Sequence, residues 1–550
     1  MTLRDLLLAR AEDDSPALLA GDRCWSWREY VAEAAARSRS LGELLDPERP
    51  PHVGVLMDNT PEMALQLAAA GLGAHVLVGL NTTRRGAGLL ADIRKADVQV
   101  LVVEQAHAGL LDELDLQGVR VVRASTDVEP LPPVEPLSPV EQLPDVEPLP
   151  DVEPVETRIS TSSISGEPTS QEPISGEAVT PDSLFMLIFT SGTSGDPKAV
   201  RITHEKVTHP GQYLNERLGL GRDDVHYVSM PLFHSNAVMA GWGPAVVSGA
   251  TVALAERFSA TGFLPDVRRY GATYANYVGK PLAYILATPA EPDDAENPLR
   301  VVFGNEAGER DTVEFARRFG CVVVDGFGST ENAVVVSRVE GTPPGSLGQP
   351  FPGVEVLDPA TGEECPRATY DEDGQVTNLD DCVGELVNTQ GMGQFAGYYN
   401  DEAATAERMR GGMYWSGDLA YRDADGWVFY AGRTADWLRV DGENLAAAPI
   451  ERILLRHPAV SEAAVYAVPD PHAGDQLVAA LVTTDAITPT AWEAFLEAQP
   501  DLATKGWPRF VRILDTLPRT ATNKVLKREL RATGLDAVTW TRAERGTSYT

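Results

Sequence analysis

An alternation of short apolar runs and helix-like segments constrains this chain most strongly, and it is clearest between Val53 and Glu104. The run HVGVLM is followed by TPEMALQLAAAGLGA, which reads as a helix with Thr60 in the cap position and Pro61 at the first turn. VLVGL and VQVLVVE then read as buried strands. Strands that alternate with helices predict a mostly parallel sheet with helices on both faces.

The same α/β pattern returns at Ser183, continues to about Tyr430, and gives way to a new block near Arg433. In that block LAAAPIERILLRHPAV reads as a helix and AAVYAVPD as a strand. At roughly 100–200 residues per domain, 550 residues predict several units. We therefore expect an α/β fold with a large multi-lobed N-terminal domain of mostly parallel sheets over 1–432. A small, mobile α+β lid should follow over 433–550.

Residues from about 127 to 177 interrupt the α/β pattern with a proline-rich repeat. VEPLPP, VEPLSP, VEQLPD, VEPLPD and VEPVE succeed one another from Val128, with ISGE beginning at Ile164 and again at Ile174. Proline at this density prevents helix and central-strand pairing. Twelve acidic residues lie here against the single base Arg158. We interpret the segment as a disordered acidic surface insertion, with a proline-rich arm for an unknown partner as the alternative.

The overall charge and the cysteines exclude several classes of function. With 46 Lys and Arg against 80 Asp and Glu, the net charge is −34, which argues against binding of nucleic acid or docking on anionic lipid through basic patches. The four cysteines are scattered and form no CxxC pair, so neither a zinc site nor a disulfide framework is indicated. No apolar run reaches about 18 residues, so no transmembrane segment is predicted. We expect a cytoplasmic protein, and peripheral contact with a membrane stays open.

The strongest chemical motif is the run LFMLIFTSGTSGDPKAV at 184–200, where an apolar strand runs into a loop of hydroxyls and glycines. Backbone N–H groups in such a loop can approach an anion closely while the hydroxyls donate to it, which suits a triphosphate. It is not a Walker A loop, because Ala199 follows the lysine where Ser or Thr is required. The plain alternative is a flexible Gly/Ser turn.

This loop resembles the phosphate-loop signature of the adenylate-forming superfamily, which comprises acyl-CoA synthetases, luciferases and peptide-synthetase adenylation domains. The resemblance covers nearly the whole chain outside the insertion, because three further motifs follow in the expected order. It implies that ATP is bound by Thr190, Ser191, Gly192, Thr193, Ser194, Gly195 and Lys198. Thr190 would also take part in catalysis.

The second motif is DGFGSTE at 325–331, which resembles the aromatic-Gly-x-Thr-Glu motif of the family. The resemblance implies that Phe327 stacks on adenine, that Asp325 lies beside the base, and that Gly328 and Ser329 complete this part of the ATP site. Thr330 would reach the α-phosphate and Glu331 would hold Mg²⁺. A hard carboxylate suits Mg²⁺, although a lone Glu is by default a solvated acid.

The third and fourth motifs are YWSGD, ending at Asp418, and LPRTATNK, ending at Lys524. By resemblance Asp418 binds the ribose, Arg433 contacts it at the hinge, and Lys524 bridges the substrate carboxylate and the α-phosphate as the catalytic lysine. Two positions depart from the family pattern. Asn523 stands where glycine is usual, and Ala435 stands where many members carry an acid or lysine. The second departure puts the balance of lid rotation in doubt, not the binding of ATP.

Further segments are similar to fatty-acid–CoA ligases, closest to the fatty-acid transport protein and very-long-chain acyl-CoA synthetase branch of mycobacterial type. Gly442 and Glu443 lie where such ligases place a loop beside the CoA channel, and His234 and Gly304 fall in segments that resemble the acyl site. The run NAVMAGWGPAVVSGA after His234 fits either a helix lining an acyl tunnel or plain core. The stretch from GLNTTR at 79–84 also matches this branch.

The prediction is an AMP-forming acid–thiol ligase of bacterial lipid metabolism, acting on a long- or very-long-chain fatty acid. Its partners would be the fatty acid, ATP and CoA, with Mg²⁺ accompanying ATP and CoA as co-substrate. One alternative is a fatty-acyl-AMP ligase that loads a carrier protein. Another is a catalytically silent protein that binds an acyl group or a nucleotide, and a third is a scaffold built on the proline-rich arm.

Overall fold

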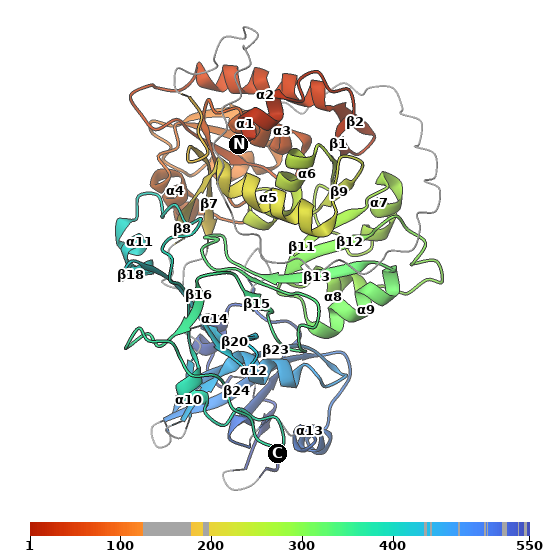
Figure 1. Cartoon of the computed structure of the whole chain (residues 1–550), viewed down its shortest axis with the longest axis vertical. Coiled ribbons are helices and arrows are strands. Elements are labelled where there is room, and N and C mark those ends of the chain that lie inside the picture. Colours follow the sequence, from red (N-terminus) through yellow and green to blue (C-terminus); the bar gives the residue numbers. More distant parts are fainter. Residues whose placement is uncertain are drawn as a thin grey trace.

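The computed structural model describes residues 1–124, 178–190, 197–433, 437–440, 443–470, 474–499, 502, 504–519, 525–536, 538–543 and 547–550. The predicted insertion at 127–177, the loop residues 191–196, Gly442 and Lys524 with Asn523 lie outside these ranges, as does Ala435. The strands within the ranges form four sheets, three before Arg433 and one after it (Figure 1). This confirms the α/β fold with a smaller C-terminal part.

The first sheet contains the strands that the alternating pattern predicts. Thr60 caps the intervening helix α3 (Pro61–Gly71) by accepting a hydrogen bond from the Met63 N–H. All neighbouring strands are parallel except the last pair, β7 and β8, which form a hairpin. In spatial order the strands are β6 (Arg120–Arg123), β5 (Val100–Val103), β3 (His52–Leu56), β4 (Val76–Gly79), β7 (Leu184–Thr190) and β8 (Lys198–Thr203).

The second sheet has nine strands, of which six consecutive neighbours are parallel and the two edges are antiparallel. One hydrophobic core joins it to the first sheet, since residues such as Met186 of β7 and Val228 of β9 belong to a single buried cluster. In spatial order the strands are β15 (Gln349–Pro350), β14 (Val336–Ser337), β13 (Val322–Phe327), β12 (Val301–Asn305), β11 (Tyr274–Val278), β9 (Val225–Val228), β10 (Thr251–Leu254), β1 (Pro16–Ala20) and β2 (Arg23–Ser26).

The third sheet was not foreseen, because it is antiparallel throughout. Its strands are joined by hairpins and loops, so the helix-strand alternation that signals parallel pairing is weak here. Four strands lie in the order β16 (Val354–Leu357), β17 (Gly384–Asn388), β19 (Met413–Arg422) and β18 (Met409–Arg410), and β20 (Val428–Arg433) also pairs with β19.

The fourth sheet belongs to the C-terminal part, which Figure 1 shows below the other three. Its helix α12 (Ala447–Leu454) lies against β20, and Arg452 donates to the Gly345 carbonyl at 3.0 Å. Both α12 and β23 match the helix and strand predicted from the sequence. The strands are β22 (Glu443–Ala446), β21 (Trp437–Val440), β24 (Gly474–Thr483), β25 (Phe510–Ile513) and β26 (Trp540–Thr541), with β23 (Val460–Asp470) paired to β24.

Helices cover the sheets, and two of them form a buried layer after His234. The π-helix η2 (Ala237–Trp242) and α6 (Gly243–Ser248) pack into the core beside α5 (His204–Leu218). The small apolar residues of this run therefore serve as core. The remaining helices are α1 (Leu3–Leu8), α2 (Trp27–Gly42), α4 (Gly86–Lys95), η1 (Gln105–Leu111), α7 (Phe263–Tyr270), α8 (Pro281–Leu286), α9 (Glu309–Phe319), α10 (Leu379–Cys382), α11 (Glu402–Arg408), α13 (Pro489–Glu497), η4 (Thr504–Gly506) and α14 (Lys527–Ala532).

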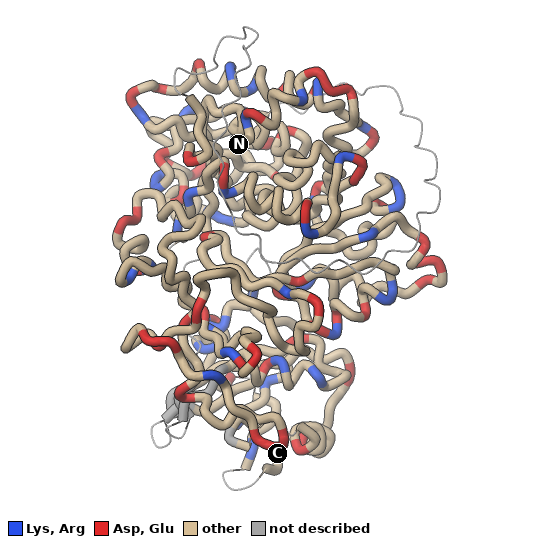
Figure 2. The backbone as a smooth tube through the Cα atoms, in the orientation of Figure 1, with Lys and Arg blue, Asp and Glu red and all other residues tan. Residues whose placement is uncertain are grey.

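Charges are spread over the whole fold. Figure 2 shows Lys and Arg interspersed with Asp and Glu on both the upper and the lower part of the molecule. No helix among the described residues combines the length and the apolar character needed to cross a bilayer.

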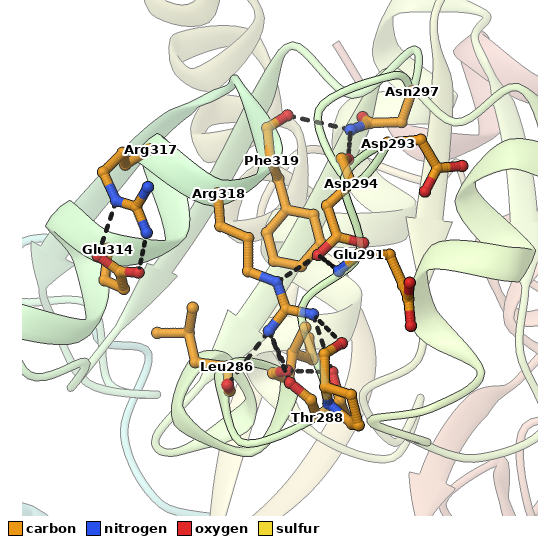
Figure 3. Close-up of polar contacts among 12 residues, drawn as sticks. Leu286, Thr288, Glu291, Asp293, Asp294, Asn297, Glu314, Arg317, Arg318 and Phe319 are labelled. Atoms are coloured by element: carbon orange, nitrogen blue, oxygen red, sulfur yellow. Dashed lines mark hydrogen bonds and ion pairs between the residues drawn. The ribbon is translucent and has the colours of Figure 1, made fainter.

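Arg318, at the end of α9, ties together the loop that follows α8. Figure 3 shows its guanidinium group pointing into a ring of acceptors, with Nε donating to Asp294 at 2.6 Å and Nη1 donating to the Thr288 carbonyl at 2.9 Å. The side chains of Arg318 and Asp294 are only 8% and 6% exposed. The neighbouring pair of Arg317 and Glu314 lies at the surface, where Arg317 is 71% exposed.

We expect Arg318→Met to lower the free energy of unfolding by about 3 kcal/mol or more, because it leaves the Asp294 carboxylate buried without its partner. Arg317→Met should change it by less than about 0.5 kcal/mol, since exposed pairs contribute little. Denaturant titration of both variants beside the parent measures the difference. Equal stability of the two variants would contradict the role of Arg318.

Candidate active site

A cleft of ≈ 2170 Å³ is lined by residues of the first three sheets and of the C-terminal part together. The C-terminal part contributes residues of α12 and α14, with Arg519 and Val525 beside them. Within the described residues, the cleft gathers most of the predicted site. Its lining includes Thr190, Lys198, His234, Asp325, Phe327, Gly328, Ser329, Thr330, Glu331, Asp418 and Arg433.

The hairpin of β7 and β8 holds the two ends of the predicted phosphate loop. Thr190 and Lys198 are paired across the hairpin, so the two ends of the predicted phosphate loop lie side by side. The Lys198 side chain is almost fully buried, with Nζ 5.1 Å from the centre of the Tyr398 ring and 3.6 Å from a Glu407 carboxylate oxygen. The lysine is therefore held at the cleft wall by a cation–π contact and an ion pair.

The end of β13 carries Asp325 in register with Gly304 of β12 and Tyr277 of β11. A Cβ atom on Gly304 would lie 2.6 Å from the Tyr277 ring, so glycine is required for that ring to cross β12. Across this gap the Tyr277 hydroxyl donates to Asp325 at 2.6 Å, and the Ala307 N–H donates to the same oxygen at 3.0 Å. The structure thus places Gly304 under Tyr277, while its assignment to an acyl site stays a prediction.

Burial dominates the electrostatics of Asp325. It raises the pKa of this carboxyl to about 6, in spite of the hydrogen bonds from Tyr277 and Ala307. Nearby Glu306 has a φ of 68°, a left-handed conformation that is rare for a residue with a side chain. Such strain collects at functional loops, and Glu306 also lines the cleft.

Phe327 and Asp418 face the cleft from two different sheets. The Phe327 ring lies 5.8 Å from that of Tyr430, so an aromatic pair forms part of the wall. Asp418 on β19 is paired in register with Arg433 on β20, whose Nε donates to it at 3.1 Å. Asp418 raises the pKa of the Arg433 guanidinium, which stays charged. The two residues predicted to contact the ribose are thus held by one ion pair.

Glu331 is a partly buried carboxylate that stays ionised. Its Oε1 accepts a hydrogen bond of 2.8 Å from the Tyr398 hydroxyl. Burial alone would raise the pKa of Glu331, but the bond from Tyr398 and the charge of Lys206 bring it below its ordinary value. One residue earlier, the Thr330 hydroxyl lies 2.9 Å from that of Ser235. An ionised carboxylate beside hydroxyls at the cleft wall fits a hard cation such as Mg²⁺.

The remaining predicted residues belong to the expected acyl, CoA and lid segments, and the structure describes only some of them. His234 lines the cleft, as do Asn81, Thr83 and Arg84 from the segment after β4. Glu443 begins strand β22. The roles of Gly442 and Lys524 stay predictions.

Sequence motifs did not point to Tyr277, Tyr398, Tyr430 or Lys206. Tyr277 lies 48 positions before Asp325, Tyr398 lies 67 positions after Glu331, and Lys206 lies 125 positions before Glu331. Tyr430 lies 12 positions after Asp418, to which its hydroxyl donates at 3.3 Å. The sequence offered one signal, and it concerns Lys206. The chain contains only seven lysines, and Lys206 lies in a helix that has several apolar residues.

Comparison with protein families gives two matches in the order of the two parts. Residues 8–399 match the model described as AMP-binding enzyme, and residues 449–524 match the AMP-binding enzyme C-terminal domain. The chain belongs to the AMP-binding enzyme family. The first match alone covers well over half of the chain, and the family is the one that the motifs resemble.

Two relatives within this family align over nearly their whole length. The medium/long-chain-fatty-acid–CoA ligase FadD17 of Mycobacterium marinum is 50% identical over 97% of both chains. The steroid-22-oyl-CoA synthetase of Rhodococcus jostii is 43% identical, over 96% of this chain and 90% of its own. Among solved structures, ATP-bound MatB from Rhodopseudomonas palustris has a TM-score of 0.77 at 22% identity, covering 98% and 99% of the two chains. This last likeness shows the AMP-binding enzyme fold.

The raised pKa of Asp325 predicts how the stability of this family member depends on pH. Since the folded-state pKa of about 6 lies above the ordinary value of 3.8 for an aspartic acid, the folded state holds a proton between those two pH values that the unfolded state has lost. We therefore expect the parent protein to lose on the order of 2 kcal/mol relative to Asp325→Asn as pH rises from 4 to 6. The comparison is made by denaturant titration at several pH values.

The exposed Asp223→Asn variant is the matched control. It should follow the parent at every pH. A constant difference between the parent and Asp325→Asn across this window would show that Asp325 does not titrate there.

Proposed function

We propose that the protein is an ATP-dependent fatty-acid–CoA ligase that works through an acyl-adenylate. The observation that carries the proposal is the 50% identity, over 97% of both chains, to a relative named medium/long-chain-fatty-acid–CoA ligase. The geometry supports it, because the cleft brings the end of the phosphate-loop hairpin, Glu331 and the pair of Asp418 and Arg433 to one place. The four cysteines are free, which fits the cytoplasmic location that we include in the proposal.

In the first step a carboxylate oxygen of the fatty acid attacks the α-phosphorus of ATP, and the bond to pyrophosphate breaks. Lys198 and the loop residues 191–196 would hold the phosphates, and Thr330 would donate to the α-phosphate. Phe327 would stack on the adenine, while Asp418 would accept from the ribose hydroxyls. Mg²⁺ at Glu331 would neutralise charge on the phosphates. Lys524 would stabilise the charge that develops between the two reacting groups.

In the second step the thiolate of CoA attacks the acyl carbonyl carbon, and AMP leaves. We assign residues 1–432 to the adenylate-binding domain and 433–550 to a lid that carries Lys524 in the first step. The lid would then present Gly442 and Glu443 to CoA, since one pocket has to accommodate two reactions at the same carbonyl. The change of sheet between β20 and β21 supports this division.

The names of the relatives bear both on the acceptor of the acyl group and on the acid that is activated. Relatives that align over the whole chain are named CoA ligases or synthetases, so neither a carrier-protein acceptor nor a silent binding protein is favoured. The 43% identity to a steroid-22-oyl-CoA synthetase makes a steroid with a carboxylated side chain the second candidate substrate. Both candidates share an apolar body and one carboxylate.

The test is the formation of AMP by the purified protein with ATP and Mg²⁺, with and without CoA. The substrates are fatty acids of C6 to C24 and a steroid C22 carboxylic acid. We expect turnover with fatty acids that requires CoA. Lys524→Ala should reduce adenylate formation by about 100-fold or more, because a charge aimed at the transition state is lost.

Lys527→Ala is the control. Lys527 lies three residues after Lys524 and forms an ion pair with Glu451 at 2.8 Å. It should retain most of the activity. Turnover with the steroid acid but with no fatty acid would identify the steroid acid as the substrate. Acyl-AMP that accumulates regardless of CoA would indicate a carrier-protein ligase. Absence of adenylate with every acid would refute the proposed function.

A further inference from the structure

Tyr398 connects two residues of the site that lie far apart in the sequence. It follows the third sheet's strand β17 and is 4% exposed. Its hydroxyl donates to Glu331 at 2.8 Å, while its ring lies 5.1 Å from the Lys198 ammonium. A single buried side chain thus contacts both the lysine of the phosphate loop and the carboxylate predicted to hold the cation.

Lys206 on α5 is a second buried group that interacts with Glu331. It is 1% exposed, and its Nζ atom has no hydrogen-bond partner among the described residues. Burial lowers the pKa of its ammonium group to about 7, and the charge of Glu331 partly offsets this effect. A charge buried without hydrogen bonds destabilises the fold unless another interaction offsets it. The charge of Lys206 therefore does not by itself stabilise the fold.

We propose that Tyr398 and Lys206 are positioning residues that hold the Glu331 carboxylate ready for the magnesium ion of Mg-ATP. The Tyr398 hydroxyl fixes the direction of the carboxylate through Oε1, and the Lys206 ammonium offsets its charge in the buried wall. This inference rests on the proposed function, because that function gives Glu331 its cation.

The physical advantage is preorganisation. A buried carboxylate without partners would either take up a proton or turn toward other donors, and it would have to reorganise each time the nucleotide arrives. With one lone pair fixed by Tyr398, the others keep a constant direction toward the cleft. Groups that are already oriented toward the charge of the ligand require no reorganisation at the moment of reaction.

Tyr398→Phe tests the hydroxyl alone, because the ring and its contact with Lys198 remain. We expect Mg-ATP to bind about ten-fold more weakly, which corresponds to about 1.4 kcal/mol, because a hydrogen bond to a charged group is lost. Binding of ATP in EDTA should equal that of the parent. Calorimetric titration with ATP and MgCl₂, and with ATP and EDTA, measures both affinities without any turnover.

Tyr399→Phe is the matched control. This neighbouring hydroxyl also donates to a carboxylate, that of Asp97, at 2.9 Å. The control should keep the parent ratio of the two affinities. If Tyr398→Phe keeps that ratio as well, the role of Tyr398 is refuted, whether or not the parent proves to be a fatty-acid–CoA ligase.

Lys206→Met tests the ammonium. Because it removes a charge buried without hydrogen bonds, we expect an unchanged or higher melting temperature of the apoprotein together with a loss of about ten-fold in the Mg²⁺-dependent gain in ATP affinity. A purely structural lysine would give the opposite pattern, with a lower melting temperature and an unchanged gain. That result would overturn the role of Lys206.

Discussion

Parallel strands end at the same edge of a sheet, and the function of this molecule depends on that constraint. β13 ends at Phe327, two residues after Asp325 and inside the motif that leads to Glu331, whereas β7, from the first sheet, ends at Thr190. Because one hydrophobic core joins the two sheets, their strand ends meet at a common cleft. Ligands of open α/β sheets bind outside the carboxyl ends of the strands for this reason. The third sheet adds Asp418 and Arg433 from the opposite side.

Local pattern and motif predicted much of this arrangement. The apolar run with Thr60 and Pro61 led directly to β3 and α3, and the motif residues with described side chains line the cleft almost without exception. The strand and helix followed from periodicity and turn chemistry within about fifteen consecutive residues, whereas the site residues followed from the resemblance of short motifs to the adenylate-forming superfamily. The antiparallel sheet of β16 to β20 has no such local signature, since its register is set by long-range pairing.

The residues that hold the motif side chains in place could not be predicted either, because their contacts also depend on long-range pairing. Tyr277 reaches Asp325 only because Gly304 leaves a gap in the strand between them, and that gap depends on the register of three strands. The substrate contact suggested for Gly304 by the sequence stays a prediction, and the structure adds that a Cβ atom at this position would collide with Tyr277. A sequence motif identifies the residues that contact a ligand more readily than the residues that position them.

Burial of the charged residues of the site shifts their pKa values, and hydrogen-bond donors counteract this effect. Asp325 and Glu331 are partly buried and Asp418 is buried, and each of these carboxylates accepts a hydrogen bond from a side chain of the protein: Tyr277, Tyr398 and Arg433. Desolvation nevertheless prevails at Asp325, in spite of the charge of Arg338, and is overcome at Glu331 by its hydrogen bonds and the charge of Lys206. The difference follows the roles proposed for them. A carboxylate beside a neutral base can tolerate a proton near pH 6, whereas one that holds a divalent cation has to stay ionised.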